Sequence, residues 1–384
     1  ENKNENLNQD EKPTSHKKFY SLINTVSELD NIIKEIYEFG SFAIDTETDS
    51  LKAINANLIG ISISYQLGKA FYIPIAHTNL EKKMVQLNKN TVITKLNPLL
   101  ENNSILKIGQ NLKYDILVLK QNGFSIISSY DDTMLMSYTL FAGLHNHNLD
   151  YLAQTYLKIE KKKYKEVVGI GKKERVFSEV EIDKATFYAC EDADVTFQLW
   201  RLFYKKIIAK KLMFIYRNIE IPLIKIIAAM EENGINVDKN SLKEISTDFQ
   251  KQLEDLKKKI LAIAGCEFNI NSPKQLSVIL FEKFKLTPPK KNKSGSYSTS
   301  SEVLEELAAA GHQIASLIID WREIAKLKST YTDGLLSNIN DRTKRIHTTF
   351  QMTGAQTGRL SSTEPNLQNI PIKTSNGRKI RRTF

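Results

Sequence analysis

The chain has 384 residues, of which 41% are hydrophobic and 26% are charged. These values are typical of a soluble globular protein, and the length suffices for two or three domains with buried cores. No stretch approaches the roughly 18 uninterrupted apolar residues of a membrane-spanning helix, so we expect no membrane partner. Lys and Arg outnumber Asp and Glu by 54 to 44, which favours an acidic partner such as nucleic acid.

The two cysteines, Cys190 and Cys266, lie far apart and in no metal-binding spacing. We expect two inert core thiols in a reducing compartment, which excludes a disulfide scaffold. Residues 1–18 are polar and lack an apolar core, and the sequence does not begin with Met. We therefore expect a disordered tail or linker in a piece of a longer protein, rather than a secretory signal or a transit peptide.

Ordered structure is expected from Phe19 onwards, beginning with a helix over residues 26–39 that ends at Gly40. Three strands joined by short turns then predict an antiparallel meander, namely the FAIDTE stretch, residues 58–65 and residues 70–75. A helix over 91–101 and a strand over 105–108 follow. Strands followed by alternating helix and strand indicate a mixed α/β sheet.

The stretch Phe42–Ser50, which reads FAIDTETDS, carries the first candidate site residues. Its first three residues read as the end of a buried strand, and the period of two places Asp45 and Glu47 on the same face. Two carboxylates side by side at the rim of an apolar sheet repel each other unless a cation lies between them. An isolated D-x-E is more often a solvated loop, so the assignment depends on further acids downstream.

Two later helices supply such acids. A helix from Asn111 to Lys120 places Asn111 and Asp115 on one face, four residues apart, while its opposite face packs inward. The stretch TFYACEDADVTFQLW is a strong helix pattern that places Tyr188 and Asp192 on one face in the same way.

The segments between these helices carry weaker signals. Asp132 is expected to be the N-cap of the next helix. His145 and His147 lack further ligands at helical or turn spacing, so a solvated loop is favoured over a zinc site. Residues 160–175 form a basic, glycine-containing linker that is expected to be solvated, with contact to phosphates as the alternative.

The pattern changes to long helices from about residue 206, after a capping box at Ser178 and Glu181 that would start a short helix. The expected helices cover residues 214–233, 241–264, 302–310 and 314–331. The Lys-, Ser- and Gly-rich residues 288–300 would form a mobile loop between two of them. Helices on either side of a basic tip suit an element that grips a nucleic-acid backbone, and a plain helical bundle is the alternative.

The acids Asp45, Glu47, Asp115 and Asp192 would carry about four negative charges at one place if they converge, with Tyr188 nearby. Two divalent cations would balance this charge, with Mg²⁺ first and Mn²⁺ or Zn²⁺ as alternatives, because hard cations take oxygen ligands. Two metal ions about 4 Å apart can clamp a phosphodiester for attack by water. A tyrosine hydroxyl within reach can orient that water. The sequence therefore predicts metal-dependent phosphodiester cleavage, on the assumption that the acids meet in space.

This order of motifs, D-x-E on a strand, N-x-x-x-D on a helix and Y-x-x-x-D on a later helix, resembles the three exonuclease motifs of the DEDDy family. Further stretches, FNINSPKQL, AKLKSTYTD and TGRLSSTEPNLQNIPI, resemble bacterial family A DNA polymerases, and the resemblance extends from about residue 40 to the end. It implies an α/β, ribonuclease H-like mixed-sheet exonuclease domain, a mainly α thumb region and the start of an α+β palm. The implied division is a tail (1–18), an exonuclease domain (19–205), a thumb region (206–340) and a first palm segment (341–384).

The resemblance also implies roles for individual residues. Asp45, Glu47 and Asp192 would ligate the first metal ion, Asp45 and Asp115 the second, and Tyr188 would position the attacking water. The expected DNA contacts are Asn111 at the end of the substrate, Arg322 and Lys326 at the base of the thumb, and Arg359, Asn366, Gln368 and Asn369 near the primer–template. Arg359 could reach the minor groove, where acceptors common to all base pairs allow a check of shape.

We expect this piece to be a 3′–5′ proofreading exonuclease that does not polymerise, because it stops at Phe384, before the catalytic aspartate motifs of the palm. Its parent would be a DNA-directed DNA polymerase of replication and repair. The expected partners are a single-stranded 3′ end of DNA at the exonuclease site and a primer–template duplex at the thumb. We expect a monomer in the bacterial cytoplasm, associated with the nucleoid, with an organelle as the alternative.

Two other functions stay open. One is a stand-alone 3′–5′ exoribonuclease with the same acids, which would prefer RNA. The other is a non-catalytic DNA-binding module, whose binding would weaken steeply with salt while no Mg²⁺-dependent cleavage occurs.

Overall fold

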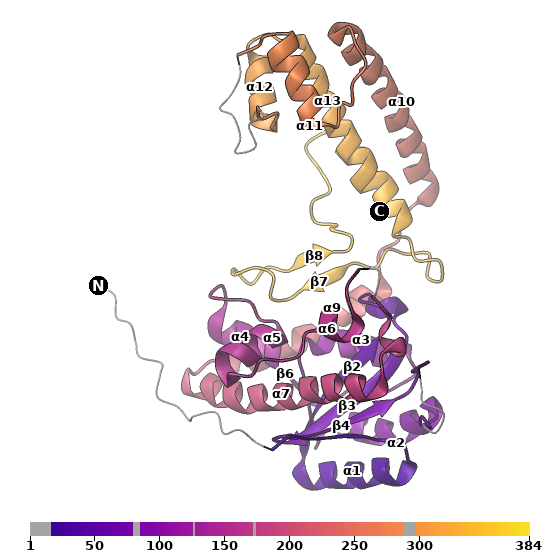
Figure 1. The fold of residues 1–384 in the computed structure, drawn as a ribbon, viewed down its shortest axis with the longest axis vertical. Helices are drawn as coiled ribbons and strands as arrows, with labels where there is room; N and C mark the ends of the chain where they lie inside the picture. Colours follow the sequence, from indigo (N-terminus) through magenta and orange to yellow (C-terminus); the bar gives the residue numbers. More distant parts are fainter. Residues whose placement is uncertain (1–16, 80–84, 126, 172–173, 288–296) are drawn as a thin grey trace, which may run out of the picture. The chain divides into compact units, whose positions relative to one another are not determined.

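The computed structural model describes residues 17–79, 85–125, 127–171, 174–287 and 297–384 (Figure 1). Its contacts divide the chain into two units, one with residues up to Asn233 and residues 349–361, the other with residues 234–348 and 362–384. Most of the expected tail (1–16) and of the expected loop (288–296) lies outside the described residues. The domain boundaries implied by the sequence stay a prediction.

The first unit contains a six-stranded mixed sheet. Its strands are β1 (Phe19–Leu22), β2 (Ser41–Thr48), β3 (Leu58–Gln66), β4 (Lys69–Pro74), β5 (Leu106–Gly109) and β6 (Tyr130–Asp132). The order across the sheet is β1-β4-β3-β2-β5-β6. Strands β2, β3 and β4 form an antiparallel meander, whereas β1 pairs parallel with β4, and β5 pairs parallel with β2 and β6. The predicted meander and mixed sheet are confirmed.

Helices cover both faces of this sheet. They are α1 (Val26–Phe39), α2 (Lys89–Glu101), α3 (Leu112–Gln121), α4 (Thr133–Phe141), α5 (Leu149–Leu152), α6 (Tyr164–Val168), α7 (Ile182–Ala209), α8 (Met213–Ile215) and α9 (Ile221–Asn233). A capping box of Thr25 and Glu28 begins α1, and Gly40 in a left-handed conformation (φ 76°) ends it, as the sequence predicts. The long helix α7 packs along strands β1 to β5 (Figure 1).

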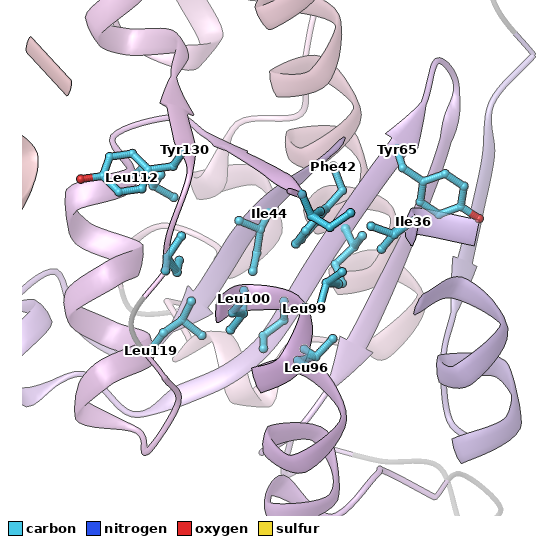
Figure 2. Close-up of a cluster of buried hydrophobic side chains, with 14 of the residues drawn as sticks. Ile36, Phe42, Ile44, Tyr65, Leu96, Leu99, Leu100, Leu112, Leu119 and Tyr130 are labelled. Atoms are coloured by element: carbon cyan, nitrogen blue, oxygen red, sulfur yellow. The ribbon is translucent and has the colours of Figure 1, made fainter. Parts of the chain in front are cut away.

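Alternation along β2 separates an apolar face from the acids. Phe42 and Ile44 join a buried cluster with Leu96, Leu99 and other residues of α1, α2 and α3 (Figure 2). Ala43, on the other parity, packs instead with Phe197 of α7. Because side chains alternate between the faces, Asp45 and Glu47 share the α7 side of the sheet with Ala43.

A buried ion pair ties α3 to α9 within the first unit. The ammonium of Lys113 contacts the carboxylate of Glu231, and the two side chains are only 6% and 8% exposed. The backbone N–H of Phe350, in strand β7 (Thr349–Gln351), donates to the same carboxylate at 2.6 Å. Glu231 therefore joins three segments that are far apart in the sequence.

The second unit is mainly helical. Its elements are α10 (Lys239–Ala264), α11 (Pro273–Ser277), α12 (Ser301–Ala309), α13 (Gln313–Lys326), α14 (Gly334–Ser337) and α15 (Ser375–Arg381), while the short strand β8 (Ser361–Thr363) falls at the boundary between the units. Helix α10 packs along α13 over apolar clusters, with Asp238 as its N-cap and Gly265 (φ 63°) at its end. The predicted long helices are confirmed. None of the helices in the described ranges is long and apolar enough to cross a membrane.

The predicted capping box at Ser178 and Glu181 is wrong. The backbone carbonyl of Ser178 accepts hydrogen bonds from the N–H and the hydroxyl of Thr78, and Ser178 lies in a separate 3₁₀ turn. Glu181 is the N-cap residue of α7 but makes no side-chain capping bond. Instead of two helices, one continuous helix of 28 residues runs from Ile182 to Ala209.

The two histidines lie in a loop, as predicted, but this loop is not solvated throughout. His147 is buried, with Nδ1 2.8 Å from the hydroxyl of Ser137. His145 places Nε2 2.7 Å from the hydroxyl of Tyr156. Both rings are therefore held by local hydrogen bonds, which the spacing of the two residues did not indicate.

Two further expectations need correction. Residues 160–175 are not a uniformly solvated linker, because they include helix α6 and the buried side chain of Lys161. Cys190 is a buried thiol as predicted, but Cys266 is exposed. Cys266 follows the glycine that ends α10, where the chain leaves the helix, so it does not join the core.

Candidate active site

Strand β2 presents the first two acids. Asp45 lies opposite Ser62 of β3, and Glu47 lies opposite Gly60. A side chain at Gly60 would overlap the hydroxyl of Tyr72, because a Cβ there would lie 2.1 Å from that oxygen. Gly60 therefore leaves room for that hydroxyl opposite Glu47, which is only 6% exposed.

Helix α3 brings the third acid to the same strand. The N–H and the hydroxyl of Thr46 donate to Oδ1 of Asp115, at 3.1 and 2.6 Å. Asn111 precedes the helix in a left-handed conformation (φ 62°) and is half-buried. Asp132 fixes the start of α3 by accepting the N–H of Leu112 at 2.7 Å. Asp132 also caps α4 through the N–H of Leu135, which confirms the predicted N-cap.

Helix α7 brings the remaining two candidates. Tyr188 and Asp192 are one helical turn apart, and Asp192 is buried. The ring of Tyr188 packs against the rings of Tyr164 and Phe177, with centroids 6.2 and 6.1 Å away. These contacts hold the phenol beside the carboxylate.

The four acids influence one another's ionisation. Burial, followed by the charges of Asp115, Glu47 and Asp192, raises the pKa of Asp45 well above its ordinary value. Burial and then Asp192 do the same for the pKa of Glu47. Burial raises the pKa of Asp115 to about 7 and that of Asp192 to about 6, although hydrogen bonds from Thr46 and the charge of Lys161 oppose these shifts. Four carboxylates from three separate segments thus share one buried region.

The phenol of Tyr188 belongs to the same region. Burial and the charges of Asp192, Glu47 and Asp45 raise the pKa of Tyr188 far above its ordinary value. The hydroxyl therefore stays protonated at neutral pH, where it can donate one hydrogen bond and accept another.

Lys161 is a site residue that the sequence did not reveal. Its ammonium lies 2.5 Å from Oδ1 of Asp192 and 3.2 Å from Oδ1 of Asp150, and its side chain is 2% exposed. Burial alone lowers the pKa of Lys161, but Asp192 and Asp150 outweigh burial and raise it, so the side chain is charged. Lys161 stands in a run of similar lysines, and no local pattern distinguishes the buried one.

The donor set fits hard divalent cations. It consists of carboxylate oxygens, and Oε1 of Glu47 is buried without a hydrogen-bond partner. Within the described ranges, no three His, Cys, Asp or Glu side chains are arranged to ligate one ion. Asp115 accepts a hydrogen bond from Thr46, and Asp192 pairs with Lys161.

The residues expected to contact duplex DNA are divided between the two units. In the second unit, the guanidinium of Arg322 donates to the backbone carbonyl of Thr299 at 2.5 Å, and Lys326 is exposed. Oε1 of Gln368 accepts the N–H of Ser362 at 3.3 Å. The exposed residues of the predicted primer–template set are Arg359 in the first unit and Asn366, Gln368 and Asn369 in the second.

Comparison with known proteins identifies the two parts. Residues 20–208 match the family model "3'-5' exonuclease", and residues 239–384 match the model "DNA polymerase family A". The chain belongs to DNA polymerase family A and carries a 3′–5′ exonuclease domain.

The similar proteins are DNA polymerases I. The chain is 42% identical to DNA polymerase I of Rhizobium leguminosarum over 97% of its own length and 38% of that protein. It is 45% identical to DNA polymerase I of Borreliella burgdorferi over 95% of its own length and 39% of that protein. A solved structure of the POL domain of Pol1 from M. smegmatis, in complex with DNA primer-template and dNTP, aligns with a TM-score of 0.75 and 28% identity, covering 95% of this chain and 58% of that one. The chain thus spans about two fifths of the length of these curated relatives.

Proposed function

We propose that the acid cluster of the first unit binds two divalent cations, Mg²⁺ above all, and removes nucleotides from single-stranded 3′ ends of DNA. The observation that carries this proposal is the pair of hydrogen bonds from Thr46 to Asp115, which bring the α3 acid to the strand that holds Asp45 and Glu47. Asp192 completes the set from α7, as its effect on the pKa of both strand acids indicates.

The position of each acid suggests which of the two metal ions it would bind. Asp45, Glu47 and Asp192 would hold one ion, and Asp45 and Asp115 would hold the other. When bound, such ions activate an attacking water and stabilise the leaving oxygen of a phosphodiester. The protein's own contribution is to fix the acids on three rigid elements and to keep bulk water from them, since three of the four are more than 90% buried.

Tyr188 and Asn111 would act on water and substrate. The phenol of Tyr188 stays protonated, so it can orient the attacking water through hydrogen bonds without taking its proton. Asn111 stands half-exposed at the start of α3, where its amide can contact the end of the DNA strand.

We further propose that the second unit binds duplex DNA and that the whole protein synthesises DNA in the cytoplasm. The similarity to DNA polymerases I, and to a structure whose title names a primer-template, supports the proposed DNA binding and DNA synthesis. Arg322, Lys326, Arg359, Asn366, Gln368 and Asn369 are the proposed contact residues. The family A match of residues 239–384 argues against a stand-alone exoribonuclease.

The proposal is tested by release of mononucleotides from 3′-labelled single strands of DNA and RNA with Mg²⁺. Asp45→Ala and Asp192→Ala should each lower the rate by at least about a thousandfold, because each removes a ligand from a two-metal site. Asp183→Ala, which removes an exposed acid in the first turn of α7, is the matched control and should retain the rate.

Three results would refute the proposal. Wild-type rates in both site variants would show that the acids are not catalytic. DNA binding without any Mg²⁺-dependent cleavage would indicate a non-catalytic module. Faster cleavage of RNA than of DNA would favour an exoribonuclease.

A further inference from the structure

The ammonium of Lys161 lies at the edge of the acid cluster, in a place built by the fold. The N–H of the next residue, Lys162, donates to Oε2 of Glu191 on α7 at 3.0 Å. The other oxygen of Glu191 pairs with Lys18 at 2.6 Å, and the carboxylate is buried. Glu191 therefore fixes the backbone beside Lys161 to the same helix that carries Asp192.

The side chain of Lys161 has two acceptors of different character. Oδ1 of Asp192, at 2.5 Å, belongs to a carboxylate side chain that is only 11% exposed. Oδ1 of Asp150, at 3.2 Å, belongs to a side chain that is 52% exposed. The ammonium also lies 5.6 Å from the ring centroid of Tyr188. The ammonium of Lys161 can thus leave Asp192 and still form an ion pair with the solvent-exposed carboxylate of Asp150.

The charge of Lys161 acts on most of the cluster. It opposes the upward shift in the pKa of Asp45, Glu47 and Asp192, whereas the neighbouring acids add to that shift. A divalent ion held by Asp192 would lie within a few ångströms of this ammonium and would be repelled by it. The ammonium and the ion therefore need the same carboxylate.

We propose that Lys161 is a resident counter-ion of the exonuclease site, which competes with divalent cations for Asp192 and moves to Asp150 when an ion binds. This inference rests on the proposed function. It makes Lys161 a positioning residue that sets the concentration of divalent ion at which the site fills.

The test is a Mn²⁺ titration of the full 384-residue chain at pH 8, followed by the electron paramagnetic resonance signal of free Mn²⁺. The relevant binding is the part that Asp45→Ala abolishes. Lys161→Met should tighten that binding by at least about tenfold, since it removes a buried positive charge next to the ion. Lys163→Met, which removes an exposed charge two residues away, should leave the affinity near that of the wild type, because solvent screens it.

A second measurement needs no variant at the site and decides the question if Lys161→Met does not fold. Amine-reactive labelling of the wild-type protein, read by peptide mass spectrometry, reports how accessible each lysine is. Labelling of Lys161 should rise severalfold when Mn²⁺ is added, as the ammonium moves towards exposed Asp150, while labelling of Lys163 stays constant.

The outcomes separate the two proposals. Unchanged or weaker Mn²⁺ binding in Lys161→Met, or labelling of Lys161 that does not respond to Mn²⁺, overturns the role of Lys161 and leaves the nuclease site intact. A wild-type chain without any Asp45-dependent Mn²⁺ binding overturns the proposed function together with the inference.

Discussion

The first unit buries two groups of acids, and they differ in what their oxygens contact. Asp131, in the middle of β6, is fully buried, yet it accepts hydrogen bonds from Trp200 at 2.8 Å and Tyr216 at 3.0 Å and pairs with Arg217 at 2.6 Å. Glu47 is almost as buried, but its Oε1 has no hydrogen-bond partner. A buried carboxylate whose oxygens all accept hydrogen bonds is compatible with a stable fold. A buried carboxylate without hydrogen-bond donors lowers the stability of the fold, unless a bound cation compensates its charge. Neutralising each acid in turn should separate these two roles.

The largest effect is expected at Glu47. Glu47→Gln should lower exonuclease activity by about a thousandfold, because it removes a proposed metal ligand. The same change should raise the free energy of unfolding of the metal-free protein by about 1 kcal/mol, since it relieves repulsion among buried acids. Nucleotide release and urea denaturation in EDTA measure the two quantities. A large loss of stability would place Glu47 with the structural acids instead.

The opposite pattern is expected at Asp131. Asp131→Asn should lower the free energy of unfolding by about 3 kcal/mol, because Arg217 loses its buried counter-charge. Activity per folded molecule should stay close to that of the wild type. Asp30→Asn is a suitable control, because Asp30 forms an exposed ion pair with Lys95 and should change stability by less than about 1 kcal/mol. Equal stability of the two variants would contradict the distinction.

The acid cluster should also make metal stabilisation depend on pH. The pKa of Asp115 is about 7 and that of Asp192 about 6, against an ordinary value of 3.8, so the folded metal-free protein holds protons that the unfolded chain releases. The stability that these protons provide is complete below about pH 4 and is lost as the pH rises through 6 to 7. Divalent ions need the ionised acids, so the rise in Tm caused by Mg²⁺ should grow from pH 5 to pH 8. A rise in Tm that is independent of pH, measured by thermal denaturation, would contradict this.

The smallest effect is expected at Tyr188. Tyr188→Phe removes one hydrogen bond to the proposed water but no charge, so the rate should fall by only about tenfold. Mn²⁺ affinity should stay unchanged, because the phenol is not a ligand. A thousandfold loss would show that the hydroxyl does more than orient water, and steady-state kinetics with titrated Mn²⁺ distinguishes these results.

The sequence predicted those features of the site that depend on the repeat of side chains along a single strand or helix. The two-residue alternation of β2 placed Asp45 with Glu47, and the four-residue spacing on α7 placed Tyr188 with Asp192, on shared faces. The predicted helical face of Asn111 and Asp115 is not formed in that way, because Asn111 precedes α3 in a left-handed conformation. The resemblance to known exonuclease motifs supplied the expectation that these three pairs meet, and the hydrogen bonds from Thr46 to Asp115 bring the acid of α3 to strand β2.

What the sequence missed depends on contacts between distant segments. Lys161 is buried because Glu191, thirty residues later, holds its backbone neighbour, and nothing in a run of lysines signals this. Ser178 fits a capping box locally, but Thr78 engages its carbonyl from a hundred residues away. In each case the partner lies outside any local window.

The ion pair of Lys113 with Glu231 has a consequence for where the nuclease can be cut out of the chain. The match to the exonuclease family ends at residue 208, yet Glu231 and Arg217, which neutralise buried Lys113 and Asp131, come later. A fragment trimmed at the limit of sequence similarity would leave two buried charges without their counter-charges. We therefore expect an independently folding nuclease to extend through α9, beyond the limit of sequence similarity.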